Sequence, residues 1–208
     1  SSPKVRIAVA GAGQIGKRHI ELIVRSTVCE LAAIVDPAPA AADYARASGV
    51  PLHNSLAEMF AQNRPDGVIL ATPNQMHVDQ ALECVAAGIP TLVEKPLAHT
   101  LEAGMRLCAA AEAADVPILV GHHRRHSSIM AKAVEVIASG MLGKIVAVVG
   151  TALFYKAENE GYFDGAFAWR RESGGGPILL NMIHEISNLR SLRGEIVQGN
   201  VAASCQAS

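Results

Sequence analysis

The sequence predicts an α/β fold with a doubly wound parallel sheet, followed by the first part of a second, incomplete α/β domain. The first 121 residues alternate short, continuously apolar runs with alanine-rich helical stretches. Continuous apolar strands between helices are typical of a parallel sheet that helices cover on both faces. The character of the chain changes after Gly121, so we expect the two domains to span residues 1–121 and 122–208.

Short strands of the first domain are expected to alternate with helical stretches. Apolar runs predict strands over residues 5–11, 31–36, 67–71, 91–95 and 117–121. Helices are expected from Gln14, over 40–48, from Ser55, over 75–87 and over 100–114. Ser55 opens the S-x-x-E pattern of a capping box, and Gly49 and Gly88 are typical helix stops.

The second domain begins with a different order of elements. A helix is expected over 127–139, then a longer strand over 144–154, a polar and glycine-rich segment over 155–177, a helix over about 177–192 and a strand from Glu195. The sequence stops before such a sheet could close. We therefore expect an open sheet of which this chain carries only the first strands.

Composition excludes several classes of partner. The chain has 208 residues, half of them hydrophobic, and a formal net charge of -1, which argues against nucleic acid. No apolar run reaches the roughly 18 residues that a membrane span needs, and the chain enters a strand without a visible signal peptide. The cysteines form no CxxC pair, which is typical of free thiols in a reducing cytoplasm. They are Cys29, Cys84, Cys108 and Cys205.

The glycine motif GAGQIG lies directly between the first strand and the first helix, a context that favours dinucleotide binding. Gly11 would make the turn, Gly13 would let the backbone approach a pyrophosphate, and Gly16 would let the helix lie close to the sheet. The alternative is a glycine-rich turn in an unrelated α/β protein. The cofactor contacts expected here are Gly11, Gly13, Gln14, Ile15 and Gly16.

Asp36 ends the second strand, twenty positions after Gly16. A carboxylate there would accept hydrogen bonds from the adenosine ribose hydroxyls and repel a 2′-phosphate. The cofactor expected is therefore NAD, with NADP disfavoured.

The segment ATPNQMHVDQA, residues 71–81, joins a strand end to a helix. Strand carboxyl ends line the ligand crevice of such a sheet, so Thr72, Pro73, Asn74 and His77 are expected to touch the cofactor. For His77, a helix-face histidine without a ligand is an equally good interpretation.

Lys95 stands in VEKPL, at the carboxyl end of a predicted core strand. An ammonium facing the crevice could stabilise the charge of a developing alkoxide. Pro96 fixes the backbone that follows, and a Lys95–Pro96 bond can be cis. The alternative is a lysine that reaches from the sheet edge into solvent.

Four motifs in this order resemble the Gfo/Idh/MocA oxidoreductases: GAGQIGKRH, ATPNQMHVDQA, VEKPL and SGGGPILLNMIH. That family includes glucose–fructose oxidoreductase, inositol dehydrogenases and dihydrodiol dehydrogenases. The resemblance implies an N-terminal Rossmann domain, a C-terminal α/β domain with an open sheet that forms homo-oligomers, and a chain that is C-terminally incomplete.

The resemblance also implies roles for individual residues. Lys95 matches the lysine that lies beside the nicotinamide and hydrogen-bonds the substrate hydroxyl. Glu94 matches the residue before that lysine, and both are expected to contact the cofactor. His184 matches the histidine that handles the substrate proton, which suits its near-neutral ordinary pKa. Where the family commonly has an aspartate, this chain has Leu180. Asn181 is three residues before His184 on the expected helix and would bind substrate instead, which points away from simple polyols.

The segment GHHRRH, residues 121–126, has two interpretations. The resemblance places His123 and Arg124 at the substrate pocket, where with Arg170 and Arg171 they would suit a carboxylate. The alternative is a solvated basic patch. No metal is expected, because the histidines lack cysteine or carboxylate partners at ligand spacing.

The function expected is hydride transfer between NAD and a secondary alcohol of a small cyclic substrate, such as a dihydrodiol, quinate-like acid, sugar or inositol. The alternative is a non-catalytic dinucleotide-binding regulator or sensor. Lys95 and His184 together favour the enzyme, because a sensor has no need of both.

Overall fold

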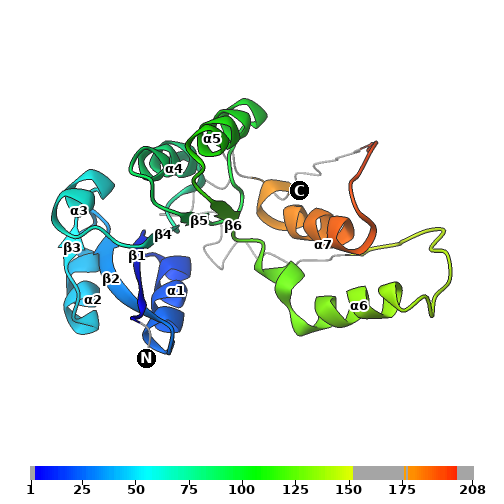
Figure 1. Cartoon of the computed structure of the whole chain (residues 1–208), viewed down its shortest axis with the longest axis horizontal. Coiled ribbons are helices and arrows are strands. Elements are labelled where there is room, and N and C mark those ends of the chain that lie inside the picture. The colour runs from blue at the N-terminus through cyan, green and yellow to red at the C-terminus, as the bar shows by residue number, and fades with distance from the viewer. Residues whose placement is uncertain (1–2, 152–175, 177, 201–208) are drawn as a thin grey trace, which may run out of the picture. The chain divides into compact units, whose positions relative to one another are not determined.

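The computed structural model describes residues 3–151, 176 and 178–200 (Figure 1). The chain divides into two compact units. Among the described residues, the first comprises 3–121, 176 and 178–180, and the second comprises 122–151 and 181–200. Predictions for Arg170, Arg171, Cys205 and residues 152–154 of the expected strand lie outside the described residues.

The first unit contains a parallel sheet of six strands in the order β3-β2-β1-β4-β5-β6. The order reverses between β1 and β4, so the loops that follow these two strands diverge and leave a crevice at their carboxyl ends. This confirms the doubly wound parallel sheet. The strands are β1 (Val5–Ala10), β2 (Cys29–Val35), β3 (Leu52–His53), β4 (Gly67–Leu70), β5 (Thr91–Val93) and β6 (Ile118–Val120).

Helices cover both faces of the sheet. One hydrophobic cluster joins β1 and β2 to α1 and α2, and the other joins the sheet to α3, α4 and α5. Helices α4 and α5 lie side by side (Figure 1). Ala8, Val9 and Ala10 of β1 are all fully buried, as expected for a strand that is covered on both faces. The helices are α1 (Gln14–Val24), α2 (Ala40–Ser48), α3 (Leu56–Gln62), α4 (His77–Ala86) and α5 (Leu101–Ala114).

Capping residues set several of the helix ends. The Ser55 side chain accepts a hydrogen bond from the Glu58 N–H at the start of α3, as the sequence pattern predicts. Glu58 accepts from the N–H of Asn54, one residue before the cap. Gly49 and Gly88 adopt positive φ after α2 and α4, which confirms them as helix stops.

The strand β5 is shorter than the sequence suggests. Its neighbour β4 ends at Leu70, which pairs with Val93, and Glu94 N–H makes the last bond to the Leu70 carbonyl. No strand continues beside Glu94 and Lys95, so the ladder stops and both residues lie in the loop beyond it. The strand β3 was not predicted, because a strand of two residues is too short to show an alternation of apolar and polar side chains.

The described part of the second unit is helical. Helix α6 (Ser128–Ala138) contacts α7 (Ile183–Arg193), and the 3₁₀-helix η2 (His123–His126) packs on α7. The strands expected from residues 144 and 195 are not formed within 144–151 and 195–200. A strand needs a neighbour to pair with, and here the Val146 and Val197 side chains are 92% and 98% exposed.

A π-helical turn, η5 (Ile178–Met182), precedes α7, where an α-helix was expected from about residue 177. The turn is wider than an α-helical one because each hydrogen bond spans five residues. Asn181 lies in this turn and His184 in α7, so their i, i+3 neighbourhood, which was expected from α-helical spacing, stays a prediction. Within the described residues, no helix is both long enough and apolar enough to cross a bilayer.

Candidate functional site

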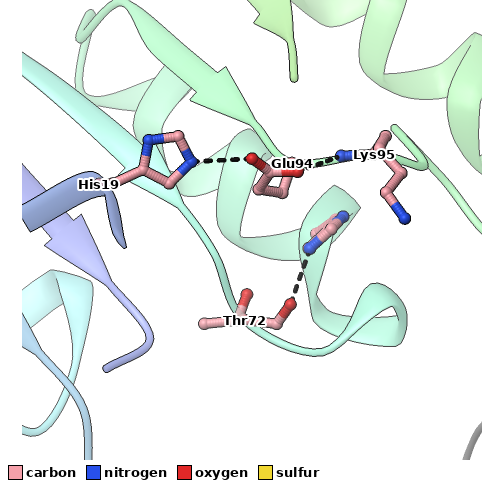
Figure 2. A network of polar contacts seen from close by, with 5 residues as sticks. His19, Thr72, Glu94 and Lys95 are labelled. Atoms are coloured by element: carbon pink, nitrogen blue, oxygen red, sulfur yellow. Dashed lines mark hydrogen bonds and ion pairs between the residues drawn. The ribbon is translucent and has the colours of Figure 1, made fainter. Parts of the chain in front are cut away.

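The crevice at the carboxyl ends of β1, β4 and β5 gathers most of the residues that the sequence singled out. Three segments follow these strands: the glycine loop from Gly11, the loop from Thr72 to α4, and residues 94–98. Figure 2 shows Thr72, Glu94 and Lys95 together with His19, which comes from α1. All of these belong to the first unit.

The glycine loop has the geometry that its three glycines predict. Gly11 has a φ of +90°, and a Cβ there would lie 2.6 Å from the Ala71 carbonyl oxygen. A Cβ on Gly16 would overlap the carbonyl oxygen of Gly11, whereas a Cβ on Gly13 would meet nothing within 4 Å. The turn and the close packing therefore need glycine for structural reasons. The space at Gly13 fits a pyrophosphate against the start of α1, near the exposed Gln14 and Ile15.

Asp36 joins this loop to the segment after β2, using one carboxylate oxygen for each. Oδ2 accepts a hydrogen bond from the Ala12 N–H at 2.7 Å, and Oδ1 accepts one from the Ala38 N–H at 2.8 Å. Each carboxylate oxygen can accept a second bond, so the ribose hydroxyls of a dinucleotide could still be bound. The next four residues are Pro-Ala-Pro-Ala, which supply no cation for a 2′-phosphate.

His77 connects two loops of the crevice. Its side chain is buried, with Nδ1 2.8 Å from the Pro96 carbonyl oxygen and Nε2 2.8 Å from the Thr72 carbonyl oxygen. Both ring nitrogens are therefore engaged by backbone. This geometry favours the second interpretation of His77, a histidine that supports the fold, over direct contact with the cofactor. The Thr72 hydroxyl donates to Gln80 of α4 at 2.6 Å, and Asn74 is buried beside them.

Glu94 uses both of its carboxylate oxygens. Oε1 lies 2.8 Å from His19 Nε2, and Oε2 accepts a bond from the Lys95 N–H at 3.1 Å (Figure 2). Burial opposes ionisation of Glu94, but the hydrogen bond and charge of His19, with the Lys95 N–H and charge, outweigh it. The pKa of Glu94 is therefore held below its usual range.

Lys95 is followed by a cis peptide bond to Pro96. Its ammonium Nζ donates to the Leu180 carbonyl oxygen at 2.9 Å. The Leu180 side chain, at the position where the aspartate was expected, is buried. Leu180 thus binds Lys95 through its backbone oxygen, while its side chain is buried.

The second unit gathers its own group of predicted residues. His184 in α7 is 4% exposed and lies edge-on to His123, with ring centroids 5.0 Å apart. His122 lies 6.3 Å from His184 in a similar edge arrangement. Arg124 forms an ion pair with Glu185 at 2.9 Å, so its charge is partly neutralised and contributes less to a cationic rim than expected.

His19 and His122 were missed by sequence reasoning. His19 stands three residues after Gly16 on α1, so it shares the sheet-facing side of that helix, and this spacing was the available signal. Lys95 and His184 belong to different units, and their pairing stays a prediction. Across the described ranges, no group of three or more histidine, cysteine, aspartate or glutamate side chains could hold a metal ion.

The fold and the crevice together define a dinucleotide-binding protein of the Rossmann type. Residues 5–122 match the family described as "Oxidoreductase family, NAD-binding Rossmann fold". Residues 130–207 match the GFO/IDH/MocA C-terminal domain. The chain belongs to the GFO/IDH/MocA oxidoreductase family.

Individual relatives agree with this assignment. The rhizopine catabolism protein MocA of Rhizobium meliloti is 29% identical over 92% of this chain and 58% of its own. The 1,5-anhydro-D-fructose reductase of Ensifer adhaerens is 30% identical over 89% of this chain and 55% of its own. The chain thus spans little more than half the length of these relatives.

A solved structure is similar at the level of fold and sequence. The WlbA dehydrogenase of Bordetella pertussis, crystallised with NADH and UDP-GlcNAcA, superposes with a TM-score of 0.81 at 30% identity. The match covers 92% of this chain and 59% of the WlbA chain.

Proposed function

We propose that the chain is the cofactor-binding part of an NAD-dependent dehydrogenase that acts on a secondary alcohol of a small, cyclic substrate. The observation that carries this is Lys95, which follows β5 at the crevice and has its backbone held by the carboxylate of Glu94. An ammonium fixed beside the cofactor crevice is suited to stabilising an alkoxide. Membership of an NAD-binding oxidoreductase family supports the same conclusion.

The residues of the first unit fit NAD. Gly13 leaves open space at the start of α1, and Asp36 keeps acceptor capacity for the ribose hydroxyls. When bound, NAD supplies the acceptor for the hydride. Lys95 would orient the substrate hydroxyl and stabilise its oxygen as it loses the proton, and His184 would accept that proton.

The substrate class follows from the residues around His184. His123, Arg124, Arg170 and Asn181 are the side chains that we assign to substrate binding. The leucine at position 180 removes a carboxylate that would hydrogen-bond a polyol, so among the expected substrates (a dihydrodiol, a quinate-like acid, a sugar or inositol) a simple polyol such as inositol is the least favoured. The relatives named for an anhydro-sugar and for a nucleotide sugar acid support a carbohydrate-like ring.

Location and assembly are parts of the same proposal. Cys29, Cys84 and Cys108 are free thiols, which supports a reducing cytoplasm. The exposed Val146 and Val197 support a homo-oligomer of the full-length protein, because exposed apolar side chains favour association.

The test is a substrate screen with the full-length protein. Cyclic alcohols, sugars and sugar acids are supplied with NAD, and NADH formation is followed by absorbance. We expect turnover with at least one compound, and its loss in Lys95→Ala. A protein that binds NADH tightly but reduces NAD with none of them would overturn the dehydrogenase and favour a sensor.

A further inference from the structure

We propose that His19 and Glu94 form a positioning pair that fixes the direction of Lys95, a role that rests on the proposed function of that lysine. His19 lies on α1, and Glu94 directly follows β5, 75 positions further along the chain. Their side chains meet at 2.8 Å and are only 21% and 13% exposed. A hydrogen bond this sheltered competes little with solvent.

The carboxylate of Glu94 is held from three directions. His19 binds Oε1, and the Lys95 N–H binds Oε2. Gly121, just after β6, packs against the carboxylate so closely that a Cβ there would lie 2.9 Å from Glu94 Cδ. The Glu94 backbone is fixed as well, because its N–H donates to the Leu70 carbonyl. The carboxylate is thus held by two hydrogen bonds and by the contact with Gly121.

The fixed position of Glu94 also fixes the backbone of Lys95. Its N–H is bound by Glu94, and the carbonyl of the following Pro96 is bound by His77. The ammonium therefore extends from a backbone segment that is held on both sides. Figure 2 shows the contact of Glu94 with the Lys95 N–H. His19 is hydrogen-bonded to Glu94, so it would act on Lys95 through that carboxylate. It is a positioning residue, and a small displacement of a reacting group can lower a rate by about 10²-fold.

Charge gives the pair a second, measurable signature. The charged or titratable groups that face Glu94 are His19 from α1 and Lys95 from its own segment, while β6 contributes the uncharged Gly121. Removing His19 takes away a hydrogen bond and a charge that lower the pKa of Glu94, so that pKa rises. If turnover needs the carboxylate, the acid limb of the kcat profile then moves to higher pH.

The experiment compares His19→Leu and His19→Gln with Arg18→Gln in the full-length protein. Glutamine keeps an N–H donor for Glu94. Arg18 is the matched control, because it neighbours His19 on the same helix but pairs with Glu21 in solvent. We expect His19→Leu to lower kcat by about ten- to hundredfold and to move the acid limb upward, with little change in NAD affinity. His19→Gln should recover most of the rate, and Arg18→Gln should match the wild type.

A measurement without cofactor separates this proposal from the proposed function. Amide exchange at Lys95 and the titration of the Glu94 carboxyl carbon are followed by NMR. In His19→Leu we expect faster exchange at Lys95 and a higher Glu94 midpoint, with neither change in Arg18→Gln. If His19→Leu changes neither the amide exchange at Lys95 nor the Glu94 midpoint, the positioning pair is refuted, whether or not the protein turns over a substrate. If both change while kcat and its acid limb stay at wild-type values, the positioning role is refuted and the pair is purely structural. A wild type without turnover would refute the dehydrogenase, and the amide exchange would still decide whether His19 orders Lys95.

Discussion

Asp36 combines a structural and a binding task in one side chain. Its carboxylate joins the glycine loop to the segment after β2 through the N–H groups of Ala12 and Ala38. The same negative charge would meet the 2′-phosphate of NADP without a compensating cation. We therefore expect cofactor choice to depend on this residue.

We expect NADH to bind more tightly than NADPH, and Asp36→Ala to reduce that difference. Loss of a charged hydrogen bond to the ribose should weaken NADH binding by about ten- to hundredfold. NADPH binding should not weaken in the same way, because the substitution removes the repulsion between the carboxylate and the 2′-phosphate. Isothermal titration with both cofactors measures this. Asp43→Ala, which breaks an exposed pair with Arg46, serves as the control. Equal affinities in the wild type would remove Asp36 from this role.

The predicted catalytic residues should be separable by what their loss affects. His184→Ala should lower kcat by about 10²–10⁴-fold, the usual effect of losing a general base, and should leave NADH affinity unchanged. Lys95→Ala should lower kcat and also raise KM, because Lys95 contacts the substrate hydroxyl. Steady-state kinetics and NADH titration distinguish the two. Near-full turnover in His184→Ala would assign the proton to another group.

At the scale of elements, the junction of β1 and α1 gives a paired prediction. Gly16→Ala should destabilise the protein by about 1–3 kcal/mol or more, because the new methyl group would overlap the backbone of Gly11. Gly13→Ala should preserve stability, since its Cβ meets open space, yet weaken NADH binding by filling the approach of the pyrophosphate. Thermal unfolding and NADH titration of both variants provide the test. Equal stability of the two variants would contradict the close packing.

The elements also show why some features could be predicted from sequence and others could not. The glycine loop, the cap at Ser55 and the alternation of strands with helices depend on neighbours in the sequence, so local patterns reveal them. The end of β5 depends on where β4 stops, and the contact of His19 with Glu94 joins residues far apart in the chain. Such features follow from the tertiary fold, which no local spacing encodes.

The second unit illustrates the same limit. Its apolar run from residue 144 has the composition of a strand, but composition does not supply the neighbouring strand that a ladder requires. The residues before α7 are also compatible with an α-helix, which is why an α-helix was expected there. The structure has a π-helical turn instead.

For the whole molecule, Glu94 links stability to pH. Its pKa is lowered in the folded protein, so its contribution is complete above the ordinary glutamate pKa of about 4.3. That contribution is lost as the pH falls through the lowered value. Glu58 and Glu195 also have lowered pKa values, but Glu195 is exposed and the Glu58 side chain is 35% exposed, so solvent screens their interactions more than those of Glu94.

We therefore expect the free energy of unfolding to fall as the pH decreases through the acid range, and Glu94→Gln to flatten that dependence. Urea unfolding of both proteins at a series of pH values measures it. Glu195→Gln should keep the wild-type slope and serves as the control. A Glu94→Gln profile parallel to the wild type would show that another group governs acid stability.

The bridge made by His77 has a consequence for protein engineering. The His77 imidazole contacts the backbone both before α4, at Thr72, and after Lys95, at Pro96. These two loops therefore depend on each other for their positions and should be exchanged as one unit. Exchanging the EKP segment alone with that of a relative would leave one ring nitrogen facing an altered carbonyl. Chimeras with a new substrate range should therefore exchange residues 72–77 and 94–98 together.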